Sequence, residues 1–224
     1  MKKIILGIIL TLSYFSVATA GPGINIGISG QMGLFSATGS EKDIGTNGTT
    51  TDADENRSRT DILGIAYSSV FVEKTLGSRL TIGYDYVPDA LATESQEHIT
   101  TDQRGSTTDN AVTNKVQVDF EDLTTYYLAF NLNENVYIKA GIVEVDLITN
   151  EKLDTGSTYG NTSIDGNMMG VGYNKTFDNG VFLRGEGTYM ELDGTSLTSS
   201  TGVNVITLNN IDGVTGKLSI GKSF

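Results

Sequence analysis

Residues 24–34 read Ile-Asn-Ile-Gly-Ile-Ser-Gly-Gln-Met-Gly-Leu. Large apolar side chains stand at almost every second position, and the positions between them are small or polar. Successive side chains of a β-strand point to opposite faces, so this period of two predicts a strand with one apolar face and one small or polar face. The stretch therefore predicts a strand that separates two different environments.

The same alternation recurs outward from this stretch and predicts seven further strands. They centre on residues 63–71, 80–86, 116–132, 136–142, 168–174, 181–189 and 214–224. In the fourth strand we expect seven even positions to share one face: Val116, Val118, Phe120, Tyr126, Leu128, Phe130 and Leu132. The pattern of the fifth strand shifts near Val143 to Asp146, where we expect a β-bulge.

The links between these strands alternate between long and short. Residues 37–60, 88–115, 149–164 and 193–205 are long and polar, whereas the links near 73–79, 131–135 and 177–180 are tight. The last tight link contains Asn179-Gly180, a strong hairpin signal. Long loops that all lie at one end favour an outer-membrane barrel, with long extracellular loops and short periplasmic turns, over a soluble sandwich.

The two faces of the strands predict which side meets lipid. The small and polar face suits a narrow, hydrated lumen, and it includes Gly27, Gly64, Gly83, Gly141, Gly170 and Gly172. The apolar face suits a lipid-facing belt, and in the second strand it holds Leu63, Ile65, Tyr67 and Phe71. Several aromatic residues fall near strand ends, where we expect interfacial girdles: Phe35, Phe71, Tyr84, Tyr86, Phe130, Tyr189 and Phe224.

The first twenty residues predict export. Lys2 and Lys3 precede an apolar run that ends in Ala18-Thr19-Ala20, a pattern typical of a signal peptide cleaved after Ala20. The run is shorter than the ~20 apolar residues of a spanning helix, which argues against a permanent anchor. We therefore expect residues 1–20 to be removed and residues 21–224 to form one barrel domain.

Charge and composition exclude several functions. Loss of Lys2 and Lys3 leaves 13 Lys and Arg against 27 Asp and Glu, a net charge of −14, so we expect no nucleic-acid partner. The chain has no cysteine. Its one histidine, His98, falls in the second long loop beside Glu94 and Glu97, without a fixed catalytic partner. We expect no catalytic residue, no metal site and no cofactor.

Five charged residues fall on the predicted inner face, each about four to seven residues from the short-turn end of its strand. They are Asp85, Lys139, Arg184, Glu186 and Lys217. At about 3.3 Å per residue this spacing puts them in one band of the lumen. Opposite charges in so narrow a tube pair with one another, so the sequence predicts a salt-bridge plug, with a small ion pathway gated by that plug as the alternative.

The final strand reads Gly216-Lys217-Leu218-Ser219-Ile220-Gly221-Lys222-Ser223-Phe224. Together with the signal, the eight strands and the loop rhythm, it resembles the small eight-stranded outer-membrane β-barrels of Gram-negative bacteria, such as OmpX, NspA and the transmembrane domain of OmpA. The resemblance implies that Leu218, Ile220 and Phe224 form the signal read by the barrel-assembly machinery. Lys222 departs from that signal, because its position is usually apolar or aromatic.

The fold class predicted is thus all-β: an eight-stranded antiparallel up-and-down transmembrane barrel. We expect a monomer in the cell outer membrane that contacts membrane lipid and lipopolysaccharide. The function favoured is a non-enzymatic role in envelope integrity and surface interaction. The alternatives are a narrow porin-like or OmpW-like channel for small solutes and, third, a lipid-modifying enzyme of the envelope.

Overall fold

The computed structural model describes residues 23–43, 56–89, 91–92, 96–102, 110–152, 158–200, 202 and 204–224. The predicted signal peptide lies outside these ranges, so its removal stays a prediction. The twelve strands are β1 (Ile24–Asp43), β2 (Asn56–Leu76), β3 (Leu80–Tyr86), β4 (Leu91–Ala92), β5 (Gln96–Asp102), β6 (Asn110–Asn131), β7 (Val136–Lys152), β8 (Thr162–Thr176), β9 (Val181–Leu192), β10 (Thr195–Thr198), β11 (Asn204–Leu208) and β12 (Ile211–Ser223). Within the described ranges no helix has the length and apolar character needed to cross a membrane.

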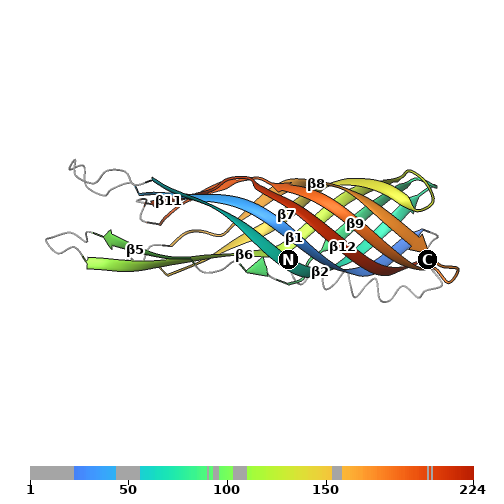
Figure 1. The fold of residues 1–224 in the computed structure, drawn as a ribbon, viewed down its shortest axis with the longest axis horizontal. Coiled ribbons are helices and arrows are strands. Elements are labelled where there is room, and N and C mark those ends of the chain that lie inside the picture. The colour runs from blue at the N-terminus through green and yellow to red at the C-terminus, as the bar shows by residue number, and fades with distance from the viewer. Residues whose placement is uncertain are drawn as a thin grey trace.

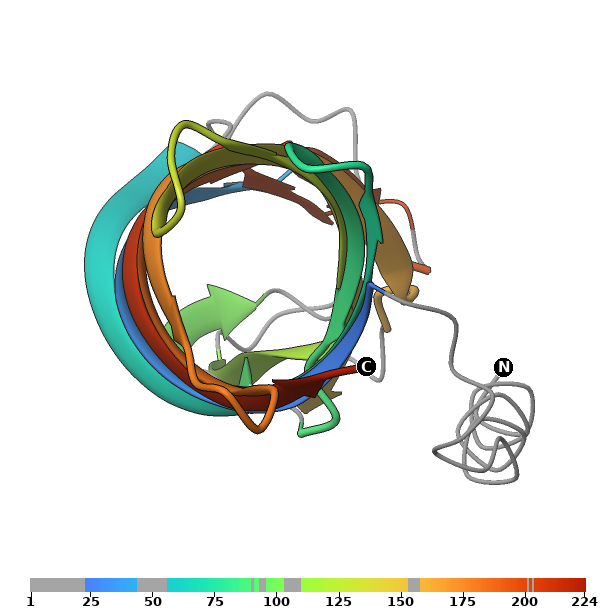
Figure 2. The same ribbon diagram turned by 90° about the vertical axis from the view of Figure 1, so that its right-hand side faces the viewer.

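Eight of these strands close into a barrel. The ring runs β1-β12-β9-β8-β7-β6-β3-β2 and returns to β1, and every pairing is antiparallel. Seen along the barrel, the ribbons form a complete circle (Figure 2). The predicted fold class, an all-β antiparallel up-and-down barrel, is confirmed.

The register fixes the slant of the strands. A row of paired residues that starts at Ile26 passes through all eight strands and returns to β1 at Ser36, ten residues further along. A stagger of this size requires strands tilted by roughly 35–45° to the barrel axis. Side chains that are distant in sequence therefore meet at one level of the lumen.

The two ends of the barrel differ. We call one the short-turn end: it holds the turns at residues 77–79, 132–135 and 177–180, together with both ends of the described chain. There the amide of Gly23 donates to the carbonyl of Phe224, and the amide of Phe224 donates to that of Ile24. We call the other the arm end, because the strands continue there as two extended arms (Figure 1).

The arms correct the predicted loop boundaries. One arm pairs β1 with β2 and β11, and β11 with β10; the other pairs β6 with β5 and β7. Much of the sequence predicted as loop, including residues 37–43, 56–60, 96–102 and 110–115, is therefore strand. His98 accordingly lies in β5, opposite Asn114, and not in a loop.

The predicted bulge lies on the neighbouring strand. The register shifts between Glu121 and Thr124 of β6, where Asp122 has a φ of 53°, while β7 alternates without interruption. The shift turns Phe120 and Val118 toward the interior core, so the even positions of β6 do not share one face. The prediction of one continuous even face from Val116 to Leu132 was wrong.

The faces of the second strand were also assigned wrongly. Tyr67 and Phe71 are buried inside the barrel and Ile65 packs against the interior core, whereas Gly64 is exposed on the outer face. Phe35 and Phe71, predicted as girdle residues, are likewise interior. The error arose because the interior of this barrel is itself partly apolar, so apolar alternation alone does not distinguish lumen from lipid.

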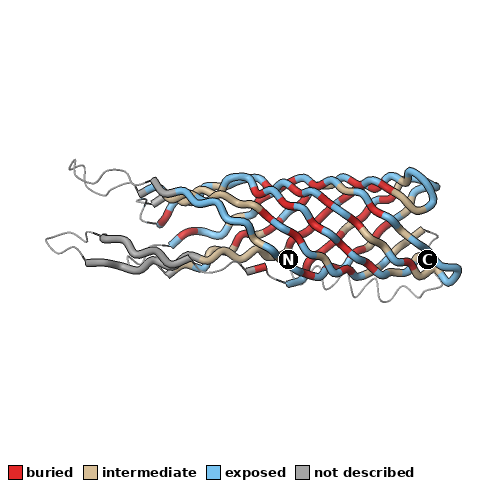
Figure 3. Tube along the Cα trace, viewed as in Figure 1, coloured by how far each residue is buried: buried red, intermediate tan, exposed pale blue. Residues whose placement is uncertain are grey.

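The outer face carries a broad apolar belt. Buried and exposed residues alternate along each strand of the barrel wall (Figure 3). Large apolar residues such as Met32, Ile62 and Leu218 are more than two-thirds exposed. A closed barrel with such a belt is suited to lipid, because backbone groups pair between neighbouring strands around the ring and the outer side chains match the acyl chains.

Candidate functional site: the filled lumen

The charged residues predicted for the inner face all point into the barrel near the short-turn end. Asp85, Lys139, Glu186 and Lys217 are buried, and the guanidinium side chain of Arg184 is 9% exposed. A sixth charged residue, Glu73 of β2, lies among them and is also buried. We call these six residues the charged layer.

Arg184 and Glu73 form the most extensive contact of the charged layer. Arg184 donates through Nη1 to Glu73 Oε1 at 2.6 Å and through Nη2 to Glu73 Oε2 at 2.9 Å. Glu73 also accepts from Tyr127 Oη at 2.6 Å and from Asn25 Nδ2 at 3.0 Å. A two-pronged contact of this kind fixes both orientation and distance, so β2 and β9 are held together across the lumen.

Two further ion pairs complete the layer. Lys139 Nζ lies 2.7 Å from Glu186 Oε1, which also accepts from Tyr137 Oη at 2.7 Å. Lys217 of β12 pairs with Asp85 of β3. β12 and β3 are three steps apart around the ring of eight, as are β2 and β9, so these contacts cross the lumen and do not join neighbouring strands.

Aromatic rings fill the space around the cations. The guanidinium carbon of Arg184 lies 5.0–5.4 Å from the ring centres of Phe71, Tyr137 and Phe182. Lys139 Nζ lies 4.7 Å above the ring of Tyr127. Cations are attracted to the faces of such rings, and the rings exclude water from the ion pairs. The charged layer is therefore a packed structure across the whole tube.

Glycines on the inner wall make room for these rings. A Cβ atom on Gly83 would lie 2.2 Å from Cζ of Tyr127, and one on Gly172 would lie 2.2 Å from Cζ of Tyr137. Tyr127 lies against β3 and donates to Glu73. Tyr137 lies against β8 and donates to Glu186. Gly83 and Gly172, both predicted to face inward, thus act as seats for these two tyrosine side chains.

A second interior layer lies on the arm side of the charged layer. Val87 follows Asp85 by two residues and lies directly after the end of β3. Val143 and Val145 follow Lys139 along β7, and Met190 follows Glu186 along β9. These residues belong to one buried apolar cluster, which we call the apolar layer: Phe35, Tyr67, Val87, Leu91, Leu123, Val143, Val145, Leu147, Ile164, Met168, Met190, Leu192 and Ile211. The prediction of a small and polar inner face holds only near the short-turn end.

The polarity of the outer face also changes at the level of the apolar layer, but in the opposite sense: acidic residues replace apolar ones. Glu144 and Asp165 are exposed and stand directly opposite each other on β7 and β8. Glu191 and Asp212 do the same on β9 and β12. We call these four residues the acidic rim. This inversion of polarity explains the shift in sequence pattern near Val143 that was predicted to be a bulge.

The barrel wall is interrupted beside the apolar layer. β2 pairs with β3 only from Val70 to Leu76, and β3 ends at Tyr86. Beyond Val70, toward the arm end, no described residue pairs with the edge of β2 that β3 would occupy. The next strand along the chain, β4, pairs with β6 instead. Ser68 Oγ and Asp89 Oδ2, 3.5 Å apart, make a side-chain contact across the interruption.

Glu73 was not among the predicted inner-face residues, because the sequence placed it in the tight link at 73–79 and the odd positions of the strand before it were predicted to face lipid. Glu73 stands opposite Gly83, which had been predicted to face inward, so cross-strand counting from the tight turn could have found it. The residues of the predicted assembly signal lie elsewhere: Leu218 and Ile220 are exposed on the outer belt, and Phe224 closes the strand ladder against Ile24. Their role in assembly stays a prediction.

Comparison with known proteins gives structural similarity only. No family model and no curated protein sequence matches the chain. The outer membrane protein OprG from Pseudomonas aeruginosa is 12% identical, with 91% of this chain and 96% of that chain covered and a TM-score of 0.45. The outer membrane protease OmpT from Escherichia coli is 10% identical over 94% and 99% of the two chains, with a TM-score of 0.44. Ail of Yersinia pestis is 11% identical over 91% and 99%, with a TM-score of 0.40.

The fold that the structure itself shows is a closed, eight-stranded antiparallel β-barrel with an apolar outer belt. At these sequence identities the similarity concerns the fold alone, and no activity of the compared proteins is inferred for this chain.

Proposed function

We propose that the protein is a closed, non-enzymatic barrel of the Gram-negative outer membrane that supports envelope integrity and presents its two arms to the outside. The observation that carries this proposal is the lumen, which two successive layers fill. Ion pairs connect strands across the lumen near the short-turn end, and a buried apolar cluster lies behind them. A filled tube stiffens the barrel and leaves no route for solutes.

Solute uptake by proteoliposomes tests this proposal. The protein is refolded into neutral phosphatidylcholine vesicles, and vesicle swelling is followed in sugars and amino acids of increasing size. We expect swelling rates equal to those of empty vesicles. Rates that rise as the solute becomes smaller would overturn the proposal in favour of a pore. Failure to fold in any lipid or detergent, with recovery as a soluble monomer, would overturn membrane insertion itself.

A conduit for small hydrophobic molecules is the second candidate function. Two observations favour it: the apolar layer, and the interruption of the β2–β3 ladder beside it. An apolar molecule in the membrane would meet the interior there without passing the charged layer. Titration with a fluorescent fatty acid distinguishes the two functions. Saturable binding that Leu91→Asp abolishes would support the conduit, and unsaturable partitioning equal to that of lipid alone would exclude it.

We infer no catalytic role. His98 lies in β5 of an arm, opposite Asn114. The buried carboxylates of the charged layer are engaged by Arg184, Lys139 and Lys217, which leaves them unsuited to proton transfer. Phospholipid hydrolysis and acyl transfer by the refolded protein are expected at the rate of protein-free vesicles. Turnover that is lost in His98→Ala would contradict this inference.

A further inference from the structure

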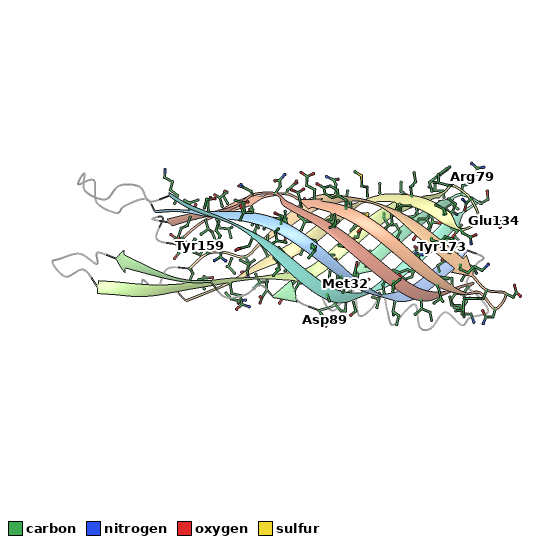
Figure 4. All side chains as sticks on the ribbon, in the orientation of Figure 1. Met32, Arg79, Asp89, Glu134, Tyr159 and Tyr173 are labelled. Atoms are coloured by element: carbon green, nitrogen blue, oxygen red, sulfur yellow. The ribbon has the colours of Figure 1, made fainter. Side chains whose placement is uncertain are left out.

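The outer face carries basic side chains at the short-turn end. Lys74, Lys175 and Lys222 lie near the ends of β2, β8 and β12, and Arg79 lies in the first tight turn. All four are exposed, and we call them the basic rim. Figure 4 shows Arg79 and Glu134 at this end of the barrel, far from Tyr159 on the arm side.

The basic rim lies at the edge of the apolar belt. Lys222 stands opposite Ile26 and Val181, and Lys175 stands opposite Leu183. Two of the cations lie beside outer-face rings: the guanidinium carbon of Arg79 is 6.0 Å from the ring centre of Phe130, and Lys222 Nζ is 5.5 Å from that of Phe224. Aromatic and basic residues together are typical of the level at which lipid headgroups begin.

Acidic residues at this end lie further from the belt. Glu134 and Asp178 are in the turns beyond the strand ends, whereas three of the four bases are within strands. The level next to the belt is therefore positive. At the other edge of the belt the acidic rim makes the corresponding level negative. The outer surface is thus polarised along the barrel axis.

We propose that the basic rim binds the phosphate groups of anionic phospholipids in the leaflet at the short-turn end. Charge complementarity selects the partner, since lysine and arginine next to a membrane are attracted to anionic headgroups. The acidic rim selects the leaflet, because the same headgroups on the arm side would repel Glu144, Asp165, Glu191 and Asp212. The proposal rests on membrane insertion, which the proposed function includes.

The test uses vesicles with phosphatidylglycerol in one leaflet only, in a phosphatidylcholine background. The full chain is refolded, protease access to the arms establishes which leaflet each end occupies, and unfolding in urea gives the folding equilibrium constant. With phosphatidylglycerol at the short-turn end, the constant is expected to rise roughly fivefold for each base that reaches the headgroups. With phosphatidylglycerol at the arm end it is expected to fall or stay level. Equal gains from both leaflets would overturn the proposal.

Two matched double variants localise the effect. Lys175→Gln with Lys222→Gln removes two charges from the rim, and Lys42→Gln with Arg59→Gln removes two charges from an arm. The first pair is expected to lose part of the gain, roughly fivefold for each removed base that reached the headgroups, because two of the four bases remain. The second pair is expected to keep the whole gain, and the wild-type gain is expected to shrink in high salt because exposed charges are screened. A gain in the rim variant as large as that of the wild type, or a gain insensitive to salt, would overturn the proposal. Folding in neutral vesicles measures membrane insertion separately, so the two proposals fail in different ways.

Discussion

The two halves of the lumen solve the same packing problem with opposite chemistry. Near the short-turn end, six charged residues and several rings fill the tube, and each pair connects strands that are not neighbours. Toward the arms, the apolar side chains of the apolar layer fill it. The outer face is apolar beside the charged half and acidic beside the far edge of the apolar half. Charged side chains thus lie behind the apolar belt, whereas at the acidic rim apolar side chains lie behind a polar outer face.

Removal of a carboxylate from the charged layer should have the largest effect. Glu73→Ala leaves Arg184 buried without its partner and deprives Tyr127 and Asn25 of their acceptor. Loss of one member of a buried pair costs about 3–5 kcal/mol, so we expect urea unfolding in lipid to show a loss of this size. The double variant Glu73→Leu with Arg184→Met should recover a large part of it. A change below about 1 kcal/mol in Glu73→Ala would mean that water solvates the pair.

Truncation of the apolar layer should cost somewhat less. Leu147 is 2% exposed, and Leu147→Ala removes three carbon atoms from the buried apolar layer. Such cavities cost about 2–5 kcal/mol in well-packed interiors. The same unfolding experiment measures the loss, with exposed Leu218→Ala as the control, which should change stability little in lipid. Equally small losses of stability in both variants would show that the apolar layer is not tightly packed.

The glycine seats give an intermediate effect. Gly83→Ala would push its Cβ into the ring of Tyr127, which shifts the hydroxyl that donates to Glu73. Overpacking of this kind costs about 1–3 kcal/mol. Gly187→Ala on β9 is the matched control, because no atom lies within 4 Å of its added Cβ. We expect that control to be neutral or slightly stabilising. Similar losses in both variants would indicate a backbone effect and not the seat.

The acidic rim gives the smallest effect, with the opposite sign. Glu144 and Asp165 are like charges placed directly across two strands. Glu144→Gln should therefore raise the free energy of unfolding by about 0.2–1 kcal/mol at low salt, and the gain should vanish at high salt. Urea unfolding at two ionic strengths measures it. A destabilised variant would show that the carboxylate of Glu144 makes a favourable contact.

The sequence predicted the fold because alternation and tight turns are local signals. It placed Asp85, Lys139, Arg184, Glu186 and Lys217 on the inner face for the same reason. It did not predict the pairing of Arg184 with Glu73, because that contact depends on the stagger of all eight strands. It also misassigned β2, since Tyr67 and Phe71 are as apolar as lipid-facing residues and only burial in the closed barrel distinguishes them.

Ionic conductance tests the closed lumen most directly. The wild-type protein is refolded into a planar lipid bilayer, and current is recorded across a range of voltages in concentrated salt, beside the Glu73→Ala and Leu147→Ala double variant. We expect no discrete conductance for the wild type, because both interior layers fill the tube, and channel openings only in the double variant. Stable, reproducible openings of the wild-type protein would contradict it.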